Sequence, residues 1–371
     1  MTETDNDPLA TDVDGPGLEG YEPPSPGGWG GYPLDELAIR DERRTAEDVV
    51  RRIKTGRFVL DPDFQRGFVW DVGKQSRLIE SILMRIPLPV FYVAEDAQGR
   101  LVVVDGRQRL TTLQRFLDME VQLHLTDRPD LNGKRFSDLD VRLQNRVQDC
   151  QLLFYIIDHD VPERARLDIF ERVNGGEVLT RQQMRNAIYN GPATALLREE
   201  AEAALFVEAT GTSLNTDKMQ DRELVNRFCS FTLLPLKSYR GDMDDWLARG
   251  LRKLNTAQEV DRGALRERFH RALRNNLRAF GRHAFRKPLK TESNRRSLIN
   301  ASLFDVMSTG LADYDECLVE SSSDRLRQAL STRMDDPNFV RSISYGPNSP
   351  KEVQTRFEIA HAMFREVFDA Q

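Results

Sequence analysis

The stretch that most constrains the fold of this 371-residue chain is RLVVVDGRQRLTTLQRFL, residues 100–117. Its apolar run LVVV predicts a buried strand, and the spacing of leucines and Phe116 after the glycine predicts a helix over about 106–117. A strand that passes into a helix at a glycine is typical of a mixed α/β arrangement. The same junction carries Arg107 and Arg109, so positive charge gathers where the helix begins.

Strand and helix signals alternate as far as Gly191. VFYVAEDAQGRLVVVDG predicts a hairpin that turns at Gly99, and QLLFYIID predicts a further strand. Thr45 and Asp71 are expected to cap helices. Beyond Gly191 helical periodicity recurs without a convincing strand. We therefore expect an α+β protein, with a mixed α/β domain over residues 34–191 and an all-helical domain over residues 192–371.

Residues 1–33 differ in composition from the rest. They hold seven acidic residues, no Lys or Arg, seven Gly and six Pro, and the whole chain has a net charge of −6. Such a segment buries too little apolar surface to fold alone, so we expect a disordered acidic tail. Two roles stay open: a solubilising leader, or an acidic segment that shields a basic groove.

Composition also excludes several classes of protein. No apolar run approaches the ~20 residues that span a bilayer, and the N-terminus lacks a signal-peptide pattern, so a cytoplasmic location is expected. The three cysteines form no CxxC pair and predict neither disulfides nor a zinc site. The five histidines form no metal-ligand pair, and no GxxxxGK[ST] phosphate loop is present.

The sequence of the Asp105–Arg109 junction allows two interpretations, phosphate binding or helix capping alone. The first backbone amides of a helix lack internal partners and favour an anion, a glycine lets a ligand approach the backbone, and arginines grip phosphate oxygens. Arg107 and Arg109 cannot both face the anion, because residues two apart point to different sides of a helix. In the other reading, Asp105 and Gln108 only form a capping box and both arginines lie on the surface.

Two more segments place polar groups in loops between apolar anchors. DPDFQRGFVWD contains Gln65 and Arg66, and RVNGGEVLTRQQMRNAIYNG has Asn174 in a turn before a helix capped by Thr180 and Gln183. Polar groups from three loops suit a single pocket. The alternative is that the aromatic residues belong to the core and Arg66 forms a surface ion pair.

Five blocks agree in order and spacing with one known family: FQRGFVW, KQSRLIESILMRIPLPVFYV, VDGRQRLTTL, LNGKRFSDL and IFERVNGGEVLTRQQMRNAIYNG. Over residues 34–191 the chain resembles the N-terminal domain of GmrSD-type modification-dependent restriction enzymes, which belongs to the ParB/sulfiredoxin-like superfamily. The resemblance implies a nucleotide pocket at the DGQQR-type motif, Asp105 to Arg109. Arg107 replaces a glutamine of that motif, and Phe64 replaces the tyrosine of the YQR-type motif.

On this basis we expect bound NTP with Mg²⁺, and hydrolysis that depends on Asp105, Gln108 and Arg109. The binding residues implied are Gln65, Arg66, Asp105, Gly106, Arg107, Arg109 and Asn174. Gln108 would orient water and Asp105 would hold the divalent ion. Replacing Arg109 with alanine is expected to abolish hydrolysis while the fold stays intact.

The helical domain contains a row of cations at four-residue spacing. Residues 262–296 include twelve Lys or Arg and two acids. Beside an apolar stripe, this row predicts a helix with an arginine-rich edge that could contact a DNA backbone. The expected contacts are Arg266, Arg274, Arg278, Arg282 and Arg286. The alternative is a solvated face, or a face that pairs with acids of the protein itself.

Together these features predict a nucleotide-binding, NTP-hydrolysing module of a DNA restriction or antiphage system that engages DNA. The alternative is a non-catalytic DNA-binding or adaptor protein with a ParB-like fold. Nuclease activity in this chain is not expected, because no HNH-like cluster is visible. The identity of the nucleotide base, a separate nuclease subunit and a homo-oligomer are left open.

Overall fold

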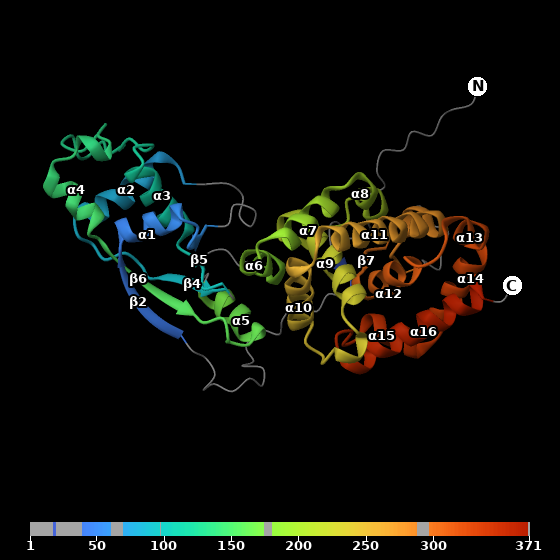
Figure 1. Cartoon of the computed structure of the whole chain (residues 1–371). Helices are drawn as coiled ribbons and strands as arrows, with labels where there is room; N and C mark the ends of the chain where they lie inside the picture. Colours follow the sequence, from blue (N-terminus) through green and yellow to red (C-terminus); the bar gives the residue numbers. More distant parts are fainter. Residues whose placement is uncertain are drawn as a thin grey trace, which may run out of the picture. The chain divides into compact units, whose positions relative to one another are not determined.

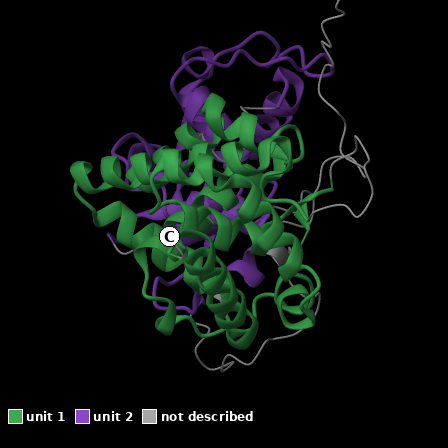
Figure 2. Ribbon diagram, turned by 90° about the vertical axis from the view of Figure 1, so that its right-hand side faces the viewer, with its two compact units in different colours: residues 1–28, 191–371 green, residues 29–190 purple. Residues whose placement is uncertain are grey.

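The computed structural model describes residues 18–19, 39–60, 70–96, 98–173, 180–287 and 297–369. The chain divides into two compact units (Figure 2). The first, residues 29–190, is called the sheet unit, and the second, residues 191–371 together with residues 1–28, is called the helical unit. The mixed α/β arrangement followed by a helical part is confirmed. The expected tail, residues 1–33, lies outside the described residues except at Leu18–Glu19.

The sheet unit is built on five strands in the order β2-β6-β4-β5-β3. Their bounds are Ile39–Thr45 (β2), Phe58–Val59 (β3), Phe91–Glu95 (β4), Leu101–Asp105 (β5) and Gln151–Ile157 (β6). The β4–β5 pair is the antiparallel hairpin predicted around Gly99, which has a φ of +73°. The central pair, β4 with β6, is parallel, and β5 pairs in parallel with β3. The sheet is therefore mixed.

Helices cover both faces of this sheet. Their bounds are Ala46–Lys54 (α1), Val72–Leu83 (α2), Arg107–Leu117 (α3), Val141–Gln148 (α4), Glu163–Val173 (α5) and Arg181–Ile188 (α6). Figure 1 shows α1 to α4 on one side of the strands and α5 on the other. Alternate residues of β5 follow this division: Val103 packs with the first group, whereas Val102 and Val104 pack with α5 and α6. Burial on both faces explains the uninterrupted apolar run of β5.

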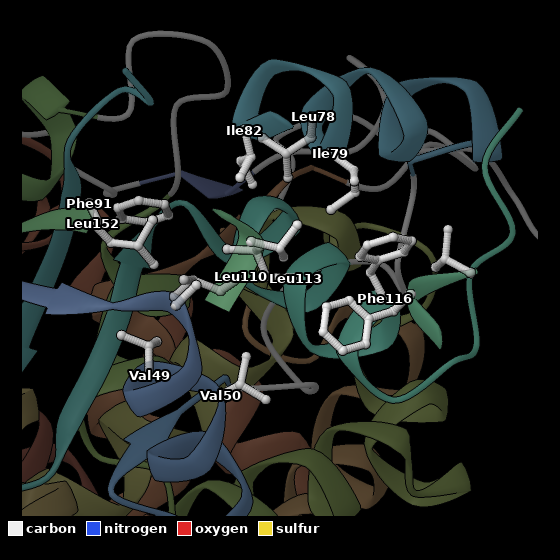
Figure 3. Close-up of a cluster of buried hydrophobic side chains, with 14 of the residues drawn as sticks. Val49, Val50, Leu78, Ile79, Ile82, Phe91, Leu110, Leu113, Phe116 and Leu152 are labelled. Atoms are coloured by element: carbon white, nitrogen blue, oxygen red, sulfur yellow. The ribbon is translucent and has the colours of Figure 1, made fainter. Parts of the chain in front are cut away.

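The larger core lies between the sheet and α1 to α4. Figure 3 shows Leu110, Leu113 and Phe116 of α3 beside apolar side chains of α2 and the strands. All three are fully buried, and their three-residue spacing puts them on one helical face. This packing fixes α3 against the sheet, and with it the junction between β5 and α3.

Local capping follows the sequence at four helix starts. Thr45, Asp71, Asp140 and Thr180 each accept a hydrogen bond from a backbone amide in the first turn of the helix that follows. The caps predicted at Thr45 and Asp71 and the capping box of Thr180 with Gln183 are confirmed. The edge strand β2, by contrast, was not predicted, because its sequence IRDERRT lacks an apolar alternation.

The helical unit contains ten α-helices among its described residues. Their bounds are Pro192–Glu202 (α7), Ala204–Thr210 (α8), Gln220–Leu233 (α9), Met243–Thr256 (α10), Glu259–Phe280 (α11), Ala301–Leu311 (α12), Glu316–Ser321 (α13), Ser323–Arg333 (α14), Pro337–Ser344 (α15) and Pro350–Phe368 (α16). One short parallel pair joins β1 (Leu18–Glu19) to β7 (Ile299–Asn300). The expectation of no strand beyond Gly191 is therefore wrong at β7. No helix in the described segments has the length and apolar content needed to span a membrane.

A buried ion cluster ties three helices of this unit together. Asp305 of α12 accepts two hydrogen bonds from Arg227 of α9, at 2.8 and 2.7 Å, and one from Arg356 of α16 at 2.9 Å. All three side chains are buried. Burial alone would lower the pKa of Arg227, but the Asp305 carboxylate outweighs that effect and raises it. One acid thus holds two guanidinium groups inside the core.

Replacing Asp305 with alanine should therefore destabilise the helical unit by about 3–5 kcal/mol, because it leaves two buried cations without their carboxylate. Urea unfolding followed by the fluorescence of the buried Trp246 reports on this unit. The control is Asp324→Ala, which removes an acid that is 96% exposed and should change stability by less than about 1 kcal/mol. Equal effects of the two substitutions would contradict the role given to the cluster.

Candidate functional site at the start of α3

The predicted junction begins with an irregularity in the hairpin. Tyr92 of β4 lies opposite Asp105, but Val93 lies opposite Val103, so β5 has one extra residue at this point. Such a bulge bends a strand and redirects the side chains beside it. Gly106 follows with φ +96° and is the N-cap of α3, whose first backbone hydrogen bond runs from Leu110 N to Gly106 O at 2.9 Å.

Gly106 is required by the packing of Phe91. A Cβ atom on Gly106 would lie 2.2 Å from Cδ1 of that ring, which is far inside van der Waals contact. The Phe91 ring is fully buried and stacks on Phe154 with a centroid distance of 5.1 Å, so it has nowhere to move. Gly106 is itself buried. An aromatic ring therefore fills the space on the Cβ side of Gly106, and the predicted contact of this residue with a ligand stays a prediction.

Arg109 points into the protein. Its guanidinium donates to Pro89 O, to Val90 O at 3.2 Å and to Asp105 Oδ2 at 2.7 Å, and it lies 4.4 Å from the centre of the Phe91 ring. Its side chain is 12% exposed, and burial lowers the pKa of the guanidinium while the Asp105 carboxylate opposes that shift. Arg109 thus joins the start of α3 to the segment that enters β4. Arg109→Ala would remove all of these contacts, so we now expect the variant to destabilise this junction and not to leave the fold intact.

Asp105 is not the N-cap of α3, although one interpretation of the sequence gave it that role. It is the last residue of β5, and the N-cap position belongs to Gly106, which has no side-chain oxygen to offer. The Asp105 side chain is 35% exposed, and its Oδ2 is held by Arg109. Within the described segments no residue hydrogen-bonds to Oδ1. A single carboxylate oxygen is thus available next to the start of α3.

Gln108 and Arg107 are both partly exposed in the first turn of α3. Gln108 Oε1 accepts a hydrogen bond from Trp70 N at 3.4 Å, and its backbone carbonyl accepts from the Thr112 hydroxyl at 2.8 Å. The first contact joins Gln108 to Trp70, which follows the segment that contains Gln65 and Arg66 in the sequence. Those two residues and Asn174 lie outside the described residues, so their predicted place in a common pocket stays a prediction.

The helix α6 carries the other predicted polar motif. Its side chains Gln182, Arg185 and Asn186 are buried, and Gln182 hydrogen-bonds to the other two at 3.1 and 2.8 Å. A helix with this much buried polar surface is unusual, because each such group has to find a partner inside the protein. The three side chains hydrogen-bond to one another inside the sheet unit, although Asn186 Nδ2 is buried without a hydrogen-bond partner.

The predicted nucleic-acid edge of α11 is largely neutralised by acids of the same unit. Arg266 pairs with Glu199 and Glu200 of α7, each at 2.7 Å. Arg274 and Arg278 both pair with Glu316 of α13. Two arginines lower the pKa of Glu316 by hydrogen bonding to its charged form, although burial opposes them. The four-residue spacing is thus matched by acids that lie 38–67 residues away in sequence.

The rest of the row does not belong to the helix. The chain leaves α11 at Phe280, where Gly281 has φ +52°. Arg282 is exposed beyond that end, whereas Arg286 is 2% exposed and donates to Thr210 O at 2.6 Å and to the Ser213 hydroxyl. The prediction of one continuous exposed edge that includes Arg286 is therefore wrong. Arg286 holds the chain against the end of α8.

Comparison with known proteins supports the predicted family. Residues 46–190 match the family model described as the GmrSD restriction endonuclease, N-terminal domain. This confirms the resemblance over most of the sheet unit, including β5, Gly106 and α3. No curated protein matches the chain. Among the described residues, no group of three or more His, Cys, Asp or Glu side chains is placed to hold a metal ion.

Position 106 requires both a positive φ and the absence of a Cβ atom, so Gly106→Ala should strongly reduce the stability of the sheet unit. Positive φ costs about 1–2 kcal/mol for alanine, and the collision with Phe91 adds about 1–3 kcal/mol. Thermal unfolding of this variant measures the sum. Gly56→Ala is the matched control: Gly56 has φ +72° with nothing within 4 Å of the added Cβ, so only the backbone cost should remain. Equal losses in the two variants would contradict the packing account.

Proposed function

We propose that the sheet unit is the nucleotide-binding module of a DNA restriction or defence system, with the phosphates held at the start of α3. Two observations support this proposal. The matched family is described as a restriction endonuclease domain, and the match covers the entire junction. The junction also presents partly exposed polar groups beside the start of a helix of eleven residues.

The observation that carries the proposal is the missing cap of α3. Four other helices of the sheet unit receive a side-chain hydrogen bond at their first turn, whereas Gly106 provides none to α3. The first amides of a helix and its dipole attract anions, so a phosphate would replace the absent side-chain cap. In this arrangement a ligand contacts the amides of residues 107–109 and not the α-carbon of Gly106.

Each side chain of the junction then has a distinct role. Arg107 supplies positive charge beside the helix start, and Gln108 lies where it can orient water near the phosphates. Arg109 acts as a positioning residue, because it holds Asp105 and the carbonyls before β4. Asp105 offers one free oxygen, which fits a Mg²⁺ ion that arrives with the phosphates and keeps most of its water ligands. That ion would supply charge neutralisation during hydrolysis.

A second function, that of a non-catalytic adaptor, is compatible with the same contacts. Phe91, Arg109 and Asp105 contact one another without any ligand, so these contacts also suit a purely structural role. A non-catalytic adaptor that binds a nucleotide or only DNA would retain the same contacts. Heat of binding without release of phosphate would favour this adaptor over the hydrolase.

The role of Asp105 can be tested with Asp105→Asn, which keeps an acceptor for Arg109 and removes the negative charge. We expect the affinity for NTP with Mg²⁺ to fall about tenfold, while the affinity for NTP without Mg²⁺ stays equal or rises, because phosphate no longer faces a carboxylate. Isothermal titration calorimetry with and without Mg²⁺ measures both affinities.

The control is Asp118→Asn at the opposite end of α3, where the acid pairs with Lys54. It should leave both affinities unchanged. If the wild-type chain binds no NTP under either condition, the nucleotide proposal fails. If Asp105→Asn weakens binding equally with and without Mg²⁺, the role assigned to its free oxygen fails.

A further inference from the structure

An open groove of about 900 Å³ lies at the end of α2 in the sheet unit. It runs between the α2–β4 connection and α4, and three of its lining residues are arginines: Arg85, Arg142 and Arg146. Its apolar lining includes Ile86 and Val141, which are 49% and 71% exposed. Asp149 is an acidic residue in the same lining. The arginines therefore outnumber the acid, and the groove has a positive surface.

These arginines differ from those of α11 in their pairing. Arg85 and Arg142 are exposed, and no described residue forms an ion pair or hydrogen bond with either guanidinium. Arg146 donates through Nη1 to Leu83 O at 3.1 Å, and its Nε is buried without a hydrogen-bond partner. The groove thus gathers cationic groups whose charge the protein leaves uncompensated.

Arg85 occupies a position that favours glycine. It follows α2 with φ +58°, in a turn closed by hydrogen bonds from Arg85 N to Ile82 O and from Ile86 N to Ser81 O, both 2.9 Å. Helices that end in this way usually place glycine there, because a side chain is strained at positive φ. An arginine at this position reduces stability, as a side chain also does at the other described non-glycine residues with positive φ, Met119, Met219 and Phe285.

The position of Arg142 in its helix is also unfavourable for a positively charged side chain. It lies in the first turn of α4, where the helix dipole disfavours a positive charge. Conflicts between local preference and the residue present are expected at functional sites. Two such conflicts line the same groove, and both introduce an unpaired guanidinium.

The uncompensated charge continues along α2. Lys74 and Arg77 are exposed one helical turn apart, and neither pairs with a described residue. From Lys74 to Arg85 the row extends about 16 Å at 1.5 Å per residue. Glu80 lies between Arg77 and Arg85, but its side chain is only 21% exposed and faces Arg128 at 3.9 Å, so positive charge remains in excess. Such an excess beside an aliphatic groove suits a polyanion such as the phosphate backbone of DNA.

We propose that this surface, formed by Lys74, Arg77, Arg85, Arg142 and Arg146, contacts the phosphate backbone of DNA. The proposal rests on the proposed function in one respect, since it assumes that the chain engages DNA. It places that contact on the sheet unit, on cations that form no ion pair with any described acid, and not on the ion-paired arginines of α11. Phosphate contacts of this kind give affinity and salt dependence without base readout.

The test uses the full chain and a fluorescein-labelled 20-base-pair duplex, with binding followed by anisotropy across a KCl series. The variant is Arg85→Gly with Arg142→Gln. We expect binding to weaken about tenfold or more and the slope of log K against log salt to fall by about 2. The melting temperature should stay the same or rise, because both substitutions relieve a local strain.

Two controls separate charge from stability. Arg43→Gln with Arg57→Gln removes two exposed cations elsewhere on the sheet unit that pair with no described acid, and it should change binding far less. Met119→Gly relieves the same type of positive φ after α3 without a change in charge and should leave binding unchanged. A lower melting temperature of the groove variant would assign the two arginines a structural role and overturn the proposal.

The outcomes also distinguish this inference from the proposed function. If the wild type binds the duplex and the groove variant binds it equally well, DNA engagement stands and the groove assignment fails. If the wild type binds no duplex, both fail, whereas nucleotide binding at α3 is judged separately by calorimetry. If poly-L-glutamate displaces the labelled duplex as well as unlabelled duplex does at equal charge, the surface recognises acidic polypeptides, and the assignment to DNA is overturned.

Discussion

The buried ring of Phe91 is the constraint on which the candidate site depends. The Phe91 ring stacks on Phe154, and the Arg109 guanidinium lies over it. Gly106 packs so close to the ring that a Cβ atom at this position would collide with it. These contacts fix the direction in which the chain leaves β5 and enters α3. The exposed groups at the start of the helix are therefore held by a rigid aromatic support, which suits a binding site that must be preformed.

Local features of the fold could be predicted from the sequence because they involve neighbours in the chain. The cap of Asp71, the turn at Gly99 and the periodicity of α3 depend on residues only a few positions apart. The packing of Phe91 against Gly106 could not be predicted, for the opposite reason. A glycine beside arginines is consistent with a bound phosphate or with a packed ring, and only the long-range placement of Phe91 decides between the two. Arg109 likewise finds its acceptors 19 and 20 residues away, at carbonyls that carry no sequence signal.

Charge shows the same difference between local pattern and long-range structure. The regular arginines of α11 formed the strongest sequence signal for nucleic acid, yet Glu199, Glu200 and Glu316 compensate much of their charge. The cations around Arg85 and Arg142 are scattered in the sequence and formed no motif, but the fold gathers them on one surface, where they form no ion pair with a described acid. Uncompensated charge in the folded state is thus a better guide to a polyanion partner than the density of arginines in the sequence.

The central claim is that phosphate groups bind the amides at the start of α3. Amide chemical shifts of residues 107–109 in a TROSY spectrum of the deuterated, ¹⁵N-labelled chain test it directly, with NTP and Mg²⁺ added in steps. The account predicts saturable shifts of these amides, whereas the amides of residues 46–48, in a helix that Thr45 already caps, stay in place. Nucleotide binding that leaves residues 107–109 unshifted would contradict it.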